Sequence, residues 1–275
     1  MAFSKEMILG ASGNQGAGAF YSHLIEHSCR FDSGDSSRLY RTFGTPSDAT
    51  KLTISFWIKI PSIPGYYQIF SRGTGYGGGG GASITLEDDL GGTDQVDIIT
   101  MYGMAGDAGG NNGANNCPNR GLRDRSSWYH IHWKVDTSKT GMSGNNAKVV
   151  LHINGELQTF GNSNEPSGNL NRFNDNGSVH HVGNGNGNTQ GDSLLAEFIF
   201  LDGQYEDYTT FGETKNGVWI PKEPSGVTFG NNGFHLKFED ASDLGNDSSG
   251  NNNDFTATGL GTDHQSLDSP TFGSG

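Results

Sequence analysis

Short stretches in which apolar and polar residues alternate recur along almost the whole chain, and no segment of ten or more residues has helical periodicity. In 128–136, for example, Tyr129, Ile131 and Trp133 share one face, whereas His130 and His132 share the other. Successive side chains of a strand point to opposite faces, so each stretch predicts a strand with one buried face. Roughly a dozen such strands predict an all-β fold, a sandwich of two large antiparallel sheets.

Turn residues between these stretches support the same fold. Asn154-Gly155 lies between two alternating runs, which is a strong signal for a hairpin. A second hairpin is expected around Gly91-Gly92. The 44 glycines and the low hydrophobic content of 32% fit short strands joined by long loops, and the aromatic content of 11% supplies core material. Disorder is disfavoured because aromatic strands recur so regularly.

Charge and cysteine content exclude several classes of function. The formal net charge is -13, with no Lys or Arg after Lys237, which argues against binding to nucleic-acid phosphates. An acidic surface fits solvation, cation binding or a basic partner. Cys29 and Cys117 are too few for a disulfide framework and match no zinc motif, so we expect no bridge. We also expect neither membrane insertion nor export by a standard signal, because long apolar runs are missing.

The chain divides into a short N-terminal region and one large domain. Residues 1–28 include a Gly/Ala segment, GASGNQGAGAF, and precede the first expected strand. We interpret 1–28 as an arm that anchors the protein on a partner or drives homo-oligomerisation, and 29–275 as one sandwich domain.

Several strands together resemble the laminin-G-like, concanavalin A-like jelly roll. The stretches that carry this resemblance are SRLYRTF, LTISFWIKI, YYQIFSRG, WYHIHWKVDTS, KVVLHINGELQ, HHVGNG and LLAEFIFLDGQ. A DSSGN signature that usually begins such domains stands near the end, in 234–258, which indicates a permuted jelly roll. Closing the same sheets would then place 234–238 close to 30–43.

A wider resemblance covers 10–259 and is to virion proteins of tailed bacteriophages of marine and freshwater bacteria. It is carried by GASGNQGAGAF, RFDSGDSSRLYRTF, FLDGQYEDYTTFGETKNGVWIPK and GFHLKFEDASDLGNDSSGNNNDFTATG. It implies a structural protein on the exterior of the virion that contacts other virion proteins, as capsid decoration, head fibre or tail fibre.

Candidate sites are few. The E-x-D-x-x-E motif of glucanases with this fold is missing, so we expect no enzyme. Trp128, His130, His132 and His152 could share one sheet face and stack host-surface glycans, with Tyr76 in a Gly-rich loop at the rim. The same H-x-H pair could chelate a metal, or the face could simply be a half-exposed sheet surface.

One loop is rich in oxygen donors. Asp247, Asn251 and Asp254 are of the type that Ca²⁺ prefers, although turn hydrogen bonds explain the same residues without a metal. No other cofactor is expected. The sequence therefore predicts a non-enzymatic virion protein, and the alternative is a receptor-binding adhesin or polysaccharide depolymerase.

Overall fold

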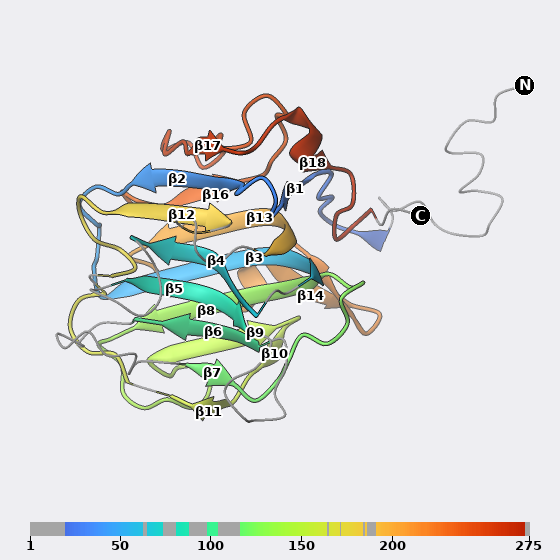
Figure 1. The fold of residues 1–275 in the computed structure, drawn as a ribbon. Helices are drawn as coiled ribbons and strands as arrows, with labels where there is room; N and C mark the ends of the chain where they lie inside the picture. Colours follow the sequence, from blue (N-terminus) through green and yellow to red (C-terminus); the bar gives the residue numbers. More distant parts are fainter. Residues whose placement is uncertain are drawn as a thin grey trace, which may run out of the picture.

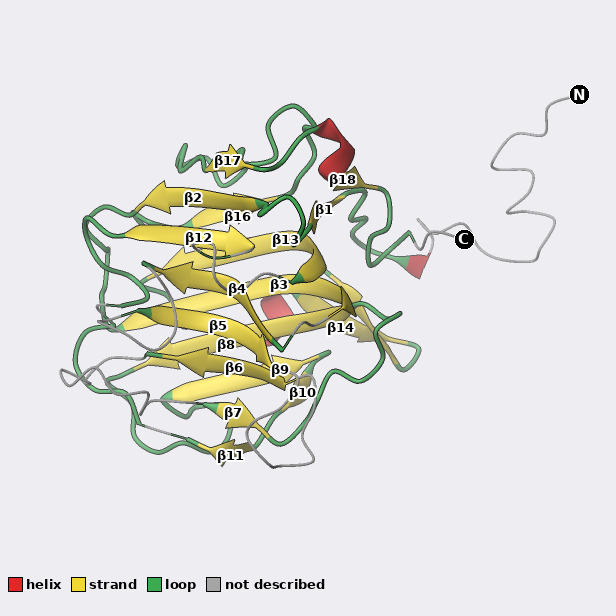
Figure 2. Cartoon of the chain, in the orientation of Figure 1, coloured by secondary structure: helices red, strands yellow, loops and turns green. Residues whose placement is uncertain are grey.

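Two antiparallel sheets pack face to face and form a jelly-roll sandwich (Figures 1 and 2). The computed structural model describes residues 20–62, 65–73, 81–87, 98–103, 116–163, 165–170, 172–183, 185 and 191–272. The larger sheet runs in the order β10 (Glu156–Leu157), β9 (Val149–Ile153), β8 (Tyr129–Asp136), β3 (Lys51–Ser62), β13 (Asp192–Asp202), β1 (Ser28–Phe31) and β18 (Gln265–Ser266), and β16 (Phe234–Leu236) also pairs with β13. The smaller sheet runs in the order β17 (Thr256–Thr258), β2 (Arg38–Thr42), β12 (Val179–Gly183), β4 (Tyr66–Arg72), β5 (Ala82–Glu87) and β6 (Ile98–Tyr102).

The remaining described elements are short. Two small ribbons pair β7 (Cys117–Pro118) with β11 (Phe160–Asn162) and β14 (Gly212–Lys215) with β15 (Val218–Pro221). Single helical turns are η1 (Tyr208–Thr210) and η2 (Thr262–His264). No helix among the described residues is long and apolar enough to cross a membrane.

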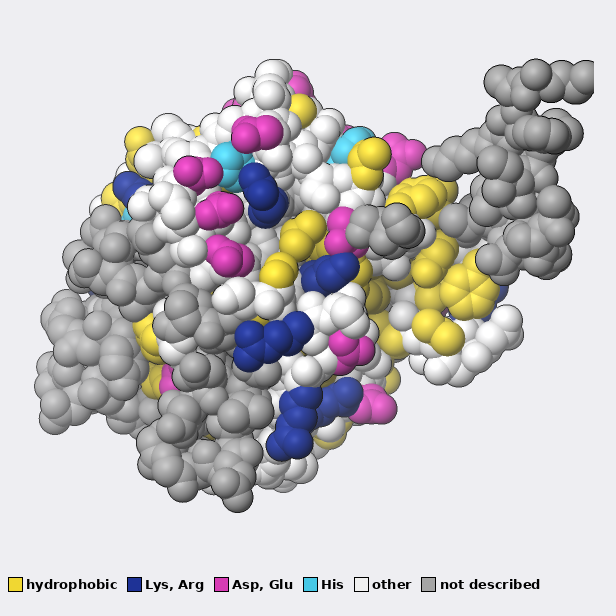
Figure 3. Space-filling view, turned by 45° about the vertical axis from the view of Figure 1, so that its right-hand side comes forward, with side chains coloured by type: hydrophobic (Ala, Val, Ile, Leu, Met, Phe, Trp, Pro, Cys, Tyr) yellow, Lys and Arg dark blue, Asp and Glu magenta, His cyan; other side chains and the backbone are white. Residues whose placement is uncertain are grey.

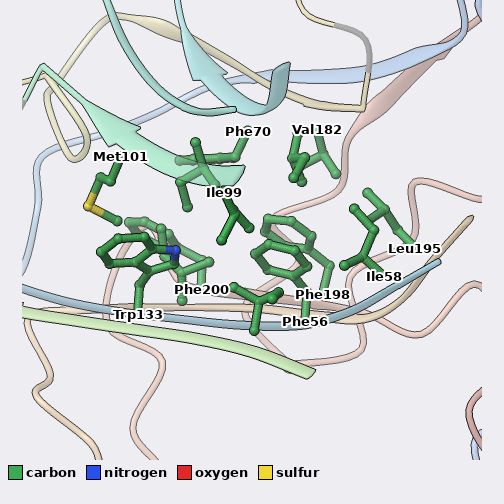
Figure 4. Close-up of a cluster of buried hydrophobic side chains, with 14 of the residues drawn as sticks. Phe56, Ile58, Phe70, Ile99, Met101, Trp133, Val182, Leu195, Phe198 and Phe200 are labelled. Carbon is green, nitrogen blue, oxygen red and sulfur yellow. The ribbon is translucent and has the colours of Figure 1, made fainter. Parts of the chain in front are cut away.

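The core between the sheets is built from the apolar faces that the alternation predicts (Figure 4). Phe56 of β3 stacks on Phe198 of β13 with ring centroids 4.9 Å apart, and Phe70 of β4 reaches the same cluster from the other sheet. Trp133 of β8 is fully buried beside them. Because large aromatic side chains bury much apolar area, a chain with this little hydrophobic content still forms a continuous core.

The predicted hairpins are present. β9 and β10 pair around Asn154 and Gly155, which adopt φ values of 51° and 75°. Positive φ at both turn positions is the geometry that favours Asn-Gly. β5 pairs with β6, as expected for the second hairpin, although Gly91-Gly92 lies outside the described residues. Cys29 and Cys117 are free and buried, and burial raises the pKa of both thiols.

The C-terminal part of the chain closes both sheets beside the first strands. β17 pairs with β2, and β18 pairs with β1. β16 continues the edge of β13 that β1 occupies, and the ring of Phe238 lies 6.5 Å from that of Phe31. The predicted proximity of 234–238 to 30–43 is confirmed.

Residues 20–28, which the sequence analysis placed in the arm, lie against the sandwich. The backbone N–H of Ile25 donates to Thr271 Oγ1 over 3.0 Å, and its side chain is buried. His23 contacts Glu197 at 3.3 Å and Glu223 at 2.7 Å. These contacts make 20–28 part of the domain, whereas residues 1–19 are outside the described chain and the anchoring role stays a prediction.

Candidate functional site

The histidines predicted to form a glycan face are buried. His130, His132 and His152 lie on the outer face of the larger sheet, opposite the core. The segment 205–221, which includes η1, β14 and β15, packs on this outer face through Tyr208 and Trp219. The prediction that these three imidazoles are open to sugars is therefore corrected, because this chain covers its own histidine face.

His130 is held on both ring nitrogens. Trp219 Nε1 donates to His130 Nδ1 over 3.1 Å, so Nδ1 is an acceptor and Nε2 carries the proton in the neutral ring. Nε2 lies 2.9 Å from the Oγ of Ser55 and donates to it. Burial, with a smaller effect from His152, lowers the pKa of His130 to about 3. The ring is therefore a neutral structural element at ordinary pH.

His132 and His152 complete this covered layer. His132 donates from Nε2 to the carbonyl of Glu206, and burial followed by the neighbouring His152 holds its pKa well below the usual range. His152 stacks on Tyr208 with ring centroids 4.0 Å apart, and burial lowers its pKa to about 4. Trp128 is half-buried and donates from Nε1 to Asp268 at 3.0 Å. Tyr76 lies outside the described residues.

The candidate calcium loop is organised by its own hydrogen bonds. Both carboxylate oxygens of Asp247 accept backbone N–H groups, among them those of His235 and Asn253. Asp254 accepts the N–H of Asp247, and Asn251 donates its amide to two carbonyls. Within the described ranges, no three His, Cys, Asp or Glu side chains form a group that could hold a metal ion. Turn formation accounts for these residues.

A different polar surface lies on the outer face of the smaller sheet. Cross-strand pairing places Tyr40 of β2, His181 of β12, Ser71 of β4, Ser83 of β5 and Tyr102 of β6 in one continuous line. We call this line the Tyr40–Tyr102 row. Neighbouring strands are about 4.8 Å apart, so the row extends for roughly 19 Å across five strands.

The middle of the Tyr40–Tyr102 row contains polar atoms without hydrogen-bond partners. His181 Nδ1, Ser71 Oγ and Ser83 Oγ are buried and unpartnered, as is Nε2 of Gln68 on the same face. A buried polar atom without a partner costs about 1–3 kcal/mol. Gly185 lies so close to Gln68 and Ser71 that a Cβ there would be 2.0 Å from the Gln68 Oε1. These atoms are enclosed, because Ser71 and Ser83 are 0% and 1% exposed, so the middle of the row is a buried polar layer and not an open binding surface.

The Tyr40 end of the row opens into a depression of about 560 Å³. Residues that line it include Arg38, Tyr40, Arg72, Ser178, Val179 and His181. Tyr40 is 37% exposed and tilts toward the His181 ring at 6.4 Å. Burial, followed by the charge of Arg38, lowers the pKa of His181 to about 4, so this ring is neutral near pH 7.

One acid lies on the same outer face. Burial raises the pKa of Glu87, while hydrogen bonds from Tyr102 and Thr85 act in the opposite direction. Glu87 pairs with Tyr66 across β4 and β5, two residues beyond the pair of Gln68 and Thr85. A carboxyl group with a raised pKa beside a polar row is a feature that favours acid chemistry.

The sequence analysis missed the Tyr40–Tyr102 row. Ser71, Ser83 and Thr85 alternate with apolar residues, which is also the pattern of an ordinary solvent-facing strand surface. The signal that could have found the row is the register of β12, β4 and β5, which brings these small polar side chains side by side. The register of four neighbouring strand pairs cannot be predicted from a single sequence.

Comparison with known proteins supports the fold. No family model matches the sequence, and no curated protein matches it significantly. A candidate carbohydrate-binding protein from Bacteroides ovatus is similar in structure, with a TM-score of 0.51, 14% identity and coverage of 85% of this chain and 58% of that chain. The chain thus spans little more than half of that protein. At such low identity, the likeness shows the jelly-roll sandwich and nothing finer.

Two other solved structures are similar at a lower level. They are a heptameric SAP-like pentraxin from Limulus polyphemus (TM-score 0.45, 11% identity, 66% of this chain and 78% of that chain) and the enzymatically active domain of tailspike protein 2 from bacteriophage CBA120 (TM-score 0.41, 14% identity, 66% of this chain and 26% of that chain). These scores are too low to carry an argument about function.

Proposed function

We propose that this chain is a non-enzymatic structural protein on the exterior of a phage virion and that its smaller sheet binds host-surface saccharides. The binding site is the depression at the Tyr40 end of the Tyr40–Tyr102 row.

The observation that carries the proposal is the open depression of about 560 Å³ with the exposed ring of Tyr40 in its wall. Sugar hydroxyls both donate and accept hydrogen bonds, so they can pair with polar side chains that line it, such as Arg38 and Ser178. Tyr40 supplies an exposed ring at the open end, where the apolar face of a sugar can stack. Ligand sites that combine an aromatic surface with a few placed polar groups are typical of small-molecule binding.

The place on the virion rests on the sequence resemblance to tailed-phage structural proteins. That resemblance continues through the segment 205–221, which in this structure covers the larger sheet. On the described surface, the depression at the Tyr40 end of the smaller sheet is open to a ligand. Many copies on one particle would strengthen the attachment even where each site is weak. Anchoring through the N-terminal arm and homo-oligomerisation belong to the same proposal.

A dedicated adhesin or a polysaccharide depolymerase is the second candidate. Glu87, with its raised pKa on the same face, is the observation that favours hydrolysis. Glycoside hydrolysis needs two carboxyl groups at a defined separation. We therefore propose binding without hydrolysis, and release of reducing ends from a bound polysaccharide, lost in Glu87→Gln, would instead support the depolymerase.

The test is a glycan array with the full chain and two variants. We expect the wild type to bind a subset of bacterial surface glycans and Tyr40→Ala to lose that signal at least tenfold, because stacking at the open end is removed. Leu157→Ala is the matched control, since Leu157 is exposed on β10 of the other sheet. Equal signals from wild type and Tyr40→Ala would refute this site, and antibody labelling of intact particles would test the virion location.

A further inference from the structure

We infer that the depression at the Tyr40 end of the row selects acidic saccharides, those with a carboxylate or sulfate group, through the guanidinium of Arg38. This inference rests on the proposed function and adds the class of ligand.

Arg38 is a cation without an acidic partner. Its one hydrogen bond is to the carbonyl of Ser36 at 3.4 Å, and no carboxylate of the described residues forms an ion pair with it. A guanidinium presents up to five N–H donors in a planar fork that matches the two oxygens of a carboxylate or sulfate. Most of these donors are available toward the depression that Arg38 lines.

The second arginine of the depression is already engaged. Arg72 donates from Nη2 to Asp175 Oδ2 over 2.6 Å, and Ser178 donates to the same oxygen. This pair fixes one wall and contributes little net charge. The uncompensated positive charge of the depression is therefore that of Arg38, beside the neutral ring of His181.

The chain as a whole is acidic, so a local positive charge is a specific feature of the depression. The chain has 30 acidic and 17 basic residues, excluding histidine. On the view of Figure 3, acidic and basic side chains are interspersed over the described surface, with hydrophobic side chains gathered at one side. A general attraction for anions is not expected from such a surface, so selection of an acidic sugar must come from a local cation.

Arg38 and Tyr40 are placed for one ligand. They are two residues apart on β2, so both side chains project from the same outer face. A sugar ring stacked on Tyr40 would have its acidic substituent within reach of Arg38, which lines the same depression. A charge-assisted hydrogen bond contributes about 1.5–3 kcal/mol, which corresponds to roughly tenfold or more in affinity.

The experiment is isothermal titration calorimetry with three probes of matched length: oligogalacturonate for carboxylate, a sulfated galactan oligosaccharide, and the neutral galactan oligosaccharide. We expect at least one acidic probe to bind the wild type about tenfold or more tightly than the neutral probe. Arg38→Gln should lower acidic binding to the neutral level. Arg123→Gln, at an exposed arginine in the segment before β8 that does not line the depression, should keep the preference.

The outcomes separate the two proposals. Equal affinity of the wild type for neutral and acidic probes, or a preference that survives in Arg38→Gln, would overturn the acidic selectivity while saccharide binding stands. If no saccharide binds in this experiment or on the array, the proposed function fails as well. Whichever acidic probe binds more tightly identifies the group that Arg38 accepts.

Discussion

The outer faces of the two sheets both carry buried polar side chains, but they differ in how these side chains are hydrogen-bonded. On the larger sheet, His130 and Ser55 are partnered with each other, and Trp219 completes the hydrogen bonding of the imidazole. On the smaller sheet, Ser71 and Ser83 lie side by side and neither hydroxyl has a partner.

The difference shows which segments cover the outer face of the larger sheet. Segments 20–28 and 205–221 bring Ile25, Phe211 and Trp219 onto the larger sheet, where they form apolar clusters with Trp57 and Ile199. The covered face is a structural layer, although Nδ1 of His132 and Nδ1 of His152 have no partner in it. On the smaller sheet Ser71 and Ser83 are buried as well, and the depression beside Tyr40 is open.

We expect acidification to have the largest effect on stability, because it acts on the buried histidines of the covered face. His130 and His132 are fully buried and keep low pKa values in the folded state, whereas in the unfolded chain they take up protons near pH 6.5. The unfolded state then binds more protons, so stability is complete above about pH 6.5 and is lost as pH falls toward 4. We expect a loss of several kcal/mol in the free energy of unfolding between pH 7 and pH 4.5, measured by urea denaturation. His132→Leu should flatten the profile, and an unchanged profile in this variant would contradict the role of the buried imidazole.

Removing the side chain of Trp219, the main aromatic residue of the cover, should have the next largest effect on stability. Trp219→Ala leaves His130 Nδ1 without its donor and empties the space against Gly155. We expect a cost of about 3 kcal/mol in the free energy of unfolding. Val218→Ala, at a neighbour that is 51% exposed, should change it by less than about 0.5 kcal/mol. A loss below 1 kcal/mol for Trp219→Ala would mean that 205–221 is not a structural cover.

Two substitutions in residues 20–28 test the N-terminal part of the cover. Ile25→Ala should destabilise the protein by about 2–3 kcal/mol because Ile25 is buried against Trp57 and Ala196. Leu24→Ala, one residue earlier and 36% exposed, should have an effect within about 0.5 kcal/mol. Thermal unfolding of both variants measures the difference. Equal, small effects of the two substitutions would mean that residues 20–28 form a detachable arm and not a structural part of the domain.

The smallest effect compares one serine from each face. Ser55→Ala removes the partner of His130 Nε2 and should cost about 1–2 kcal/mol. Ser83→Ala removes an unpartnered hydroxyl, so stability should be unchanged or rise by up to about 1 kcal/mol. If Ser83→Ala destabilises as much as Ser55→Ala, the hydroxyl has a partner in solution and the comparison between the faces fails.

Much of the fold follows from local sequence pattern. Alternation placed Leu52, Ile54 and Phe56 in the core, and Asn154-Gly155 placed a hairpin turn, because both are properties of neighbouring residues. Closure by the last strands was also predicted, since the signature in 234–258 indicated a permuted sandwich.

The candidate site was not predictable in the same way. Alternation shows that His130 and His132 share a face but does not show that Trp219, nearly ninety residues later, packs on it. The segment 205–221 contains Phe211, Trp219 and Ile220 among its turn residues, and the sequence does not show on which face these apolar side chains pack. Which face is covered depends on contacts between distant segments, and these follow only from the folded arrangement.

Pairing of the first strands with the last also constrains when the protein can fold during its translation. Ser28 pairs with Ser266 and Tyr40 with Thr256, so β1 and β2 leave the ribosome long before these partners exist. Until then, the nascent chain presents uncovered strand edges, which attract other strands and chaperones alike. Productive folding must therefore wait until nearly the whole described chain has been translated, and premature arrest of translation should yield aggregating fragments instead of a smaller stable sandwich.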